Sequence, residues 1–109
     1  MSPLPIALVS IALSVAAQFA LKAGMAGRAR GLALLWEPWL LAGFALYGIG
    51  ALVWLAVLAR WDVSKAYPLV GLGFAASVAI GWAAGEQVSA LRVAGVALVC
   101  AGVACIARS

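Results

Sequence analysis

Residues 39–59 read WLLAGFALYGIGALVWLAVLA and contain no charged side chain. At a rise of 1.5 Å per residue, an α-helix of this length spans about 30 Å, the thickness of the hydrocarbon core of a bilayer. Lipid offers the backbone no hydrogen-bond partners, so such a run must satisfy its own N–H and C=O groups as a helix. This stretch therefore predicts a membrane-spanning helix.

Three further apolar stretches of similar length flank it, at residues 4–21, 66–84 and 90–107. They predict an all-α membrane protein, a single four-helix transmembrane domain over residues 1–109 with short loops. The stretch at 4–21 is longer than the ~7–15 apolar residues of a secretory signal, and no Lys or Arg precedes it. We therefore expect it to be a retained first helix.

The composition agrees with this prediction. Hydrophobic residues make up 68% of the 109 residues, charged residues only 9%, and the mean hydropathy is +1.19. Soluble domains contain about 25% charged residues, and a chain this short has too small a core to hide so much apolar surface. The four tryptophans near predicted helix ends are typical of interfacial anchors: Trp36, Trp39, Trp61 and Trp82.

The loops between the apolar stretches contain residues that are expected to begin the following helices. We name them loop one (residues 23–38), loop two (60–65) and loop three (85–89). Ser89 is expected to cap the last helix. If Ser64 caps the third helix, Pro68 lies within its first turn, where a missing N–H requires no kink.

The loop charges are nearly balanced between the two sides of the membrane. With four spans, loops one and three share one side, and loop two shares the other with both termini. One side of the membrane then has four basic residues, Lys22, Arg28, Arg30 and Arg92, and the other side has three, Arg60, Lys65 and Arg108. Under the positive-inside rule this gives a weak preference. Either loop one sets a single orientation, or the chain pairs with an oppositely inserted partner.

No enzymatic or metal-binding constellation is found in the sequence. Its only carboxylates are Glu37, Asp62 and Glu86, all in loops, and it contains no histidine. Cys100 and Cys105 point to different sides of a helix and predict packing residues rather than a metal or redox pair. We therefore expect no catalysis and no cofactor. The seven basic residues form no patch with aromatic neighbours, so we expect no nucleic-acid partner.

The first helix carries a polar stripe, which we define as Ser10, Ser14, Gln18 and Lys22. Residues four apart share a helix face, and the row drifts by about 40° per step. The serines have a packing explanation, because hydroxyls bond to backbone and small residues let helices approach. An amide in hydrocarbon needs a partner. Lys22 can reach the membrane surface as an anchor, or it can receive an anionic group.

The order of these features resembles small four-helix members of the drug/metabolite transporter superfamily, nearly from end to end. The Arn-type, EamA-like subunits match better than the small multidrug resistance family. The matching motifs are Leu13, Ser14, Val15 and Ala16 with Gln18 and Lys22; Trp54 and Leu55 with Val57 and Leu58; Ala66, Tyr67, Pro68 and Leu69 with Leu72 and Phe74; Glu86 with Val88 and Ser89; and Gly95, Val96 and Ala97 with Gly102.

The resemblance to the multidrug exporters lacks a central element. Their proton-coupled export of cations depends on a glutamate in the membrane part of helix one. The matching position here is Ser14, and no predicted span contains a carboxylate. An intramembrane exchange of protons for cations is therefore not expected.

The Arn-type resemblance implies a bacterial inner-membrane flippase or transporter subunit for a polyprenyl-phosphate-linked sugar, such as 4-amino-4-deoxy-L-arabinose-phosphoundecaprenol. It implies membrane lipids as neighbours and an antiparallel homodimer or a heterodimer with a similar small subunit. Ser10, Ser14, Gln18, Lys22 and Tyr67 are the expected substrate-binding residues, hydroxyls and the amide for the sugar and the ammonium for the phosphate. A multidrug-resistance-like exporter and a non-transporting assembly subunit are the alternatives.

Overall fold

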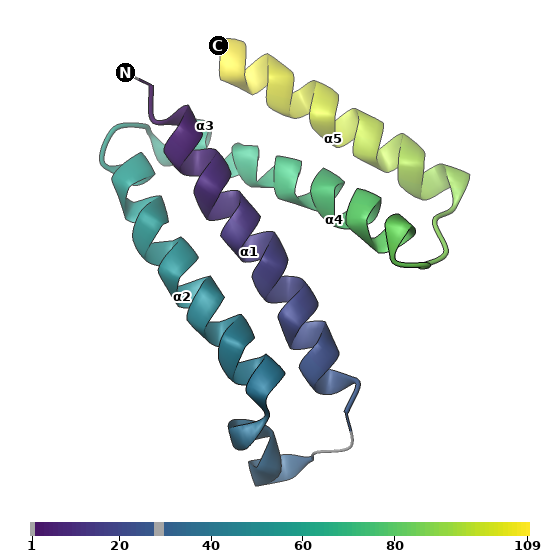
Figure 1. The fold of residues 1–109 in the computed structure, drawn as a ribbon. Helices are drawn as coiled ribbons and strands as arrows, with labels where there is room; N and C mark the ends of the chain where they lie inside the picture. Colours follow the sequence, from purple (N-terminus) through teal and green to yellow (C-terminus); the bar gives the residue numbers. More distant parts are fainter. Residues whose placement is uncertain (1, 28–29) are drawn as a thin grey trace. The chain divides into compact units, whose positions relative to one another are not determined.

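The computed structural model describes residues 2–27 and 30–109 (Figure 1). Arg28, one of the loop-one charges, lies outside them. The described residues contain four helical segments long and apolar enough to cross a membrane, which confirms the all-α, four-span prediction. The chain divides into two compact units, Met1–Val57 and Leu58–Ser109, each of which contains a helical hairpin.

The first unit pairs α1 (Leu4–Met25) with α2 (Pro38–Leu58). Glycines let the two helices approach closely at three levels. Gly24 of α1 lies against Leu40, Gly43 of α2 against Leu21, and Gly50 of α2 against Leu13. The contact positions fall along α1 as they rise along α2, so the two helices run antiparallel, side by side (Figure 1).

Loop one contains a short element that the sequence did not predict, a 3₁₀ helix η1 at Gly31–Trp36. Gly31 opens it with a φ of 64°, in the left-handed region that suits glycine. α1 also runs to Met25, past the predicted end at residue 21. Lys22 lies in its last turn, where a positive charge is favourable against the negative end of the helix dipole.

The second unit begins with a span interrupted at Pro68. It consists of α3 (Val63–Ala66), the 3₁₀ turn η2 (Tyr67–Val70) and α4 (Gly71–Ala83). Asp62, rather than Ser64, occupies the N-cap position, so the helix starts earlier than the cap prediction requires. Pro68 therefore lies beyond the first turn. It has no N–H for an i→i−4 bond, which explains why the backbone tightens there into a 3₁₀ turn.

A tight turn joins α4 to α5 (Ala90–Arg108). The N–H of Glu86 donates to the Gly81 carbonyl at 2.9 Å and that of Gly85 to the Trp82 carbonyl at 3.1 Å. With a φ of 98° at Gly85, this is a Schellman termination. The expected cap of the last helix is confirmed, because the Ser89 hydroxyl accepts a bond from the Arg92 N–H at 3.1 Å.

Candidate functional site

The polar stripe of α1 passes from a buried to an exposed environment along the helix. Ser10 is buried, with 3% of its surface exposed, and Ser14 is half-buried. Gln18 and Lys22 are exposed. The drift of about 40° per step explains this gradient, because each step turns the row further from the face that contacts α2.

Ser10 takes part in the contact between the two helices. Its hydroxyl donates to the carbonyl oxygen of Gly50 in α2 at 2.7 Å, a buried hydrogen bond across the hairpin. A Cβ added to Gly50 would lie 3.4 Å from the Ser10 carbonyl oxygen and 3.6 Å from the Ser14 hydroxyl oxygen. The structure thus brings Ser10 and Ser14 together at Gly50, and it uses the Ser10 hydroxyl for helix pairing.

Gln18 and Lys22 form the accessible end of the stripe. Among the described residues, neither side chain has a hydrogen bond or ion pair within the protein. An amide and an ammonium together offer five N–H donors and one carbonyl acceptor. This pair can therefore receive a polar, anionic headgroup at the end of α1.

Tyr67 belongs to the second unit. It is the first residue of η2 and is 64% exposed, so its hydroxyl is available to a ligand. Ser77, in α4 of the same unit, is different, because its hydroxyl donates to the Gly73 carbonyl of its own helix at 2.8 Å.

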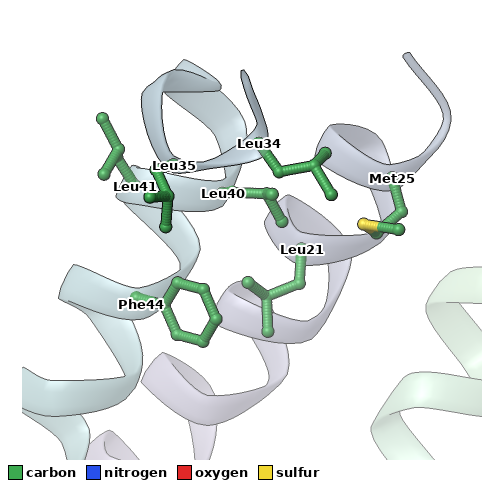
Figure 2. Close-up of a pocket in the computed structure, with 7 residues that line it drawn as sticks. All are labelled: Leu21, Met25, Leu34, Leu35, Leu40, Leu41 and Phe44. Carbon is green, nitrogen blue, oxygen red and sulfur yellow. The ribbon is translucent and has the colours of Figure 1, made fainter. Parts of the chain in front are cut away.

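A hydrocarbon-lined groove lies at the loop-one end of the first unit (Figure 2). Its seven lining side chains come from α1 (Leu21, Met25), η1 (Leu34, Leu35) and α2 (Leu40, Leu41, Phe44). Sequence reasoning missed the groove because it treated loop one as a polar connection. The available signal was the apolar run of residues 32–36 between Arg30 and Glu37.

The three carboxylates lie at helix boundaries. Glu37 directly precedes α2, where its Oε1 accepts a bond from the Trp39 N–H at 3.2 Å. Asp62 directly precedes α3, and Glu86 follows the end of α4. The membrane-spanning helices therefore contain no acidic side chain. In the described part of the chain, no group of three His, Cys, Asp or Glu could hold a metal ion.

Curated relatives were found across much of the chain. A protein of Pseudomonas savastanoi pv. phaseolicola is 42% identical over 73 residues, which cover 66% of this chain and 64% of the relative. Two proteins from different strains of Pseudomonas fluorescens are 44% and 35% identical, over 72% and 86% of this chain and 75% and 83% of their own lengths. Each is named "Probable 4-amino-4-deoxy-L-arabinose-phosphoundecaprenol flippase subunit ArnE". The chain belongs to the ArnE family.

Membership of the ArnE family confirms the Arn-type resemblance. The family name describes a transport protein and not an enzyme, in agreement with the sequence prediction. Together with the four apolar helices, it makes the chain a multi-pass protein of the bacterial inner membrane. No protein-family model matches the chain, and no solved structure matches it.

Proposed function

We propose that the chain is a subunit of a flippase that moves a polyprenyl-phosphate-linked sugar across the inner membrane. The substrate named for its relatives is 4-amino-4-deoxy-L-arabinose-phosphoundecaprenol. The observation that carries the proposal is the polar stripe of α1, whose exposed end presents Gln18 and Lys22 on an otherwise apolar helix.

The stripe matches the physical problem of flipping such a lipid. The sugar and the phosphodiester must cross hydrocarbon, where unpaired polar groups cost several kcal/mol each. Ser14 and Gln18 can exchange hydrogen bonds with sugar hydroxyls, and the Lys22 ammonium can neutralise the phosphate. Tyr67, taken within the second unit alone, is an exposed phenol that we propose as a further hydrogen-bonding group for the substrate. Ser10 supports the site indirectly, through its bond to Gly50.

We propose further that two chains assemble around the pathway, as an antiparallel homodimer or with a similar small subunit. Four short helices enclose little space, and the loop charges permit either orientation. Within the second unit, the last helix has a face that no neighbouring helix of that unit covers, and this face suits a partner helix. Gly95 and Gly102 have no neighbour within 4 Å of an added Cβ, and Val103 is the one buried residue of α5.

A flipping assay tests the proposal. Proteoliposomes would contain the purified chain alone or with a co-purified partner, and a fluorescent polyprenyl-phosphate sugar whose exposure is read by a membrane-impermeant quencher. We expect protein-dependent flipping that is lost when Gln18 and Lys22 are both replaced by alanine. Export of a lipophilic cation without lipid flipping would instead identify an exporter. If the chain by itself flips no lipid but stimulates a separate transporter, it is an assembly subunit.

A further inference from the structure

The groove at the loop-one end of the first unit has the dimensions and lining of a binding site for hydrocarbon. Its volume is about 440 Å³, within the range of roughly 300–1,000 Å³ that is usual for ligand pockets. All of its lining side chains are apolar (Figure 2). The side chain of Phe44 is 65% exposed and that of Leu35 is 62% exposed. A hydrocarbon chain bound in the groove would therefore bury apolar surface that the fold leaves exposed.

Two glycine contacts set the floor of the groove. A Cβ on Gly24 would lie 2.7 Å from Cγ of Leu40, and a Cβ on Gly43 would lie 2.7 Å from Cδ2 of Leu21. Both distances are far below a van der Waals contact, so each leucine can occupy its place only because the opposite residue is glycine. Gly24 and Gly43 thus leave the space in which Leu40 and Leu21 pack between the two helices.

The wall formed by η1 is held at both ends. Before it, the Arg30 guanidinium donates to the Gly27 carbonyl at 2.9 Å. After it, the Glu37 N–H donates to the Leu34 carbonyl at 3.1 Å, while the Glu37 carboxylate receives the Trp39 N–H. These bonds place Leu34 and Leu35 over the ends of α1 and α2, as Figure 2 shows.

Lys22 is close, along α1, to two residues that line the groove. It follows Leu21 in α1 and is about 60° from Met25 around the helix axis, and both of these neighbours line the groove. The first unit therefore presents an exposed ammonium beside a hydrocarbon cavity. A ligand that complements both features has an anionic group attached directly to an apolar chain.

We propose that this groove binds the first isoprene units of the polyprenyl chain, those next to the phosphate, while Lys22 contacts the phosphate itself. The inference rests on the proposed function and names a subsite for the lipid tail. The substrate named for the relatives joins a polyprenyl chain directly to a phosphate, and this junction complements an apolar groove next to an ammonium group. The site would hold the substrate at the junction of head and tail and leave the remaining tail in the bilayer.

Photo-crosslinking tests the assignment directly. The probe is a polyprenyl phosphate with a diazirine on its first isoprene unit, added to proteoliposomes of the full chain with its partner. We expect mass spectrometry to find the label on peptides containing Leu34, Leu35, Leu41 or Phe44. A diacyl phosphatidic acid with a diazirine near its headgroup is the control, and it should label these peptides weakly.

Groove-filling variants provide the matched comparison. Leu41→Trp adds bulk inside the groove, whereas Leu52→Trp adds the same bulk at an exposed position of α2 outside it. We expect Leu41→Trp to lower both labelling and flipping by about tenfold or more, since a misfit of even one methylene in an apolar pocket has effects of this size, and Leu52→Trp to leave both unchanged. Phe44→Trp, a smaller change at the groove, serves if Leu41→Trp fails to fold.

The outcomes separate this inference from the proposed function. Flipping without labelling of the groove peptides would overturn the subsite and leave the flippase function standing. Labelling without flipping would support the subsite and contradict the function. Equal labelling by the diacyl probe would overturn the assignment to an isoprenoid chain, and equal losses in both tryptophan variants would overturn the groove as the site.

Discussion

The hydroxyl of Ser10 donates a buried hydrogen bond of 2.7 Å to the carbonyl oxygen of Gly50, 40 residues further along the chain. It ties the first two membrane-spanning helices together at a level where Gly50 removes the side chain between them. The stripe of α1 thus has two parts. Ser10 stabilises the hairpin, while Gln18 and Lys22 remain available to a ligand.

Replacing Ser10 by alanine should therefore weaken helix pairing. Loss of an interhelical hydrogen bond in a membrane protein costs about 0.6–1.7 kcal/mol, and we expect a decrease of this size in the free energy of unfolding. Tryptophan fluorescence during denaturation in mixed micelles would measure it. Ser14→Ala is the control and should change stability less, because Ser14 is only half-buried. Equal losses in both variants would contradict the special role of Ser10.

Gly43→Ala should destabilise the hairpin, because the added methyl would meet Leu21 at 2.7 Å and the backbone N of Leu21 at 3.1 Å. Overpacking of this kind costs about 1–3 kcal/mol. Gly48 lies in the same helix with nothing within 4 Å of an added Cβ, so Gly48→Ala should be neutral or slightly stabilising. The same unfolding measurement compares the two. A neutral Gly43→Ala would show that Leu21 can move aside freely.

Lys22→Ala should abolish flipping while expression and assembly stay near normal, because the side chain is exposed and its proposed role is to bind phosphate. Lys22→Arg should retain part of the activity, since the charge remains although the geometry of its donors differs. The fluorescent flipping assay and size-exclusion chromatography are the measurements. Wild-type flipping by the alanine variant would reduce Lys22 to an interfacial anchor.

The chain should not export lipophilic cations in exchange for protons. Such exchange needs a membrane-embedded group that binds either a proton or a cation, and α1 contains no acidic side chain, with Ser14 at the position that the sequence resemblance aligns with the exporters' glutamate. Ethidium efflux from vesicles with an imposed pH gradient is the measurement, with Ser14→Glu as the comparison. Gradient-driven efflux by the unmodified chain would show that a boundary carboxylate such as Glu86 serves the transport pathway.

Loop one should be accessible from both sides of the membrane across the population of chains, if the assembly is antiparallel. Single cysteines at Ala26 in loop one and Ser64 in loop two, introduced after Cys100 and Cys105 are replaced, would report this by labelling with an impermeant maleimide. Both positions are exposed. If loop one of every copy, the partner included, reacts from the same side, the antiparallel assembly is excluded.

Several features could be predicted from the sequence because they depend on local physical chemistry. Residues 39–59 must form a helix in lipid, since no other arrangement of one segment satisfies its backbone. Ser89 could be recognised as a cap from its position before the last apolar run. Lys22 could be recognised as the charged end of the stripe from the four-residue spacing alone.

The tertiary structure alone decided how these helices use their side chains. Whether Ser10 binds a sugar or a neighbouring helix depends on which residue of α2 lies opposite, and Gly50 is remote in sequence. The groove likewise requires η1 to fold over the ends of α1 and α2, and it requires Gly24 and Gly43 to lie beneath leucines of the opposite helix. Hydropathy determines which segments enter the bilayer, but the pairing of helix faces depends on contacts between distant residues, which local sequence patterns do not encode.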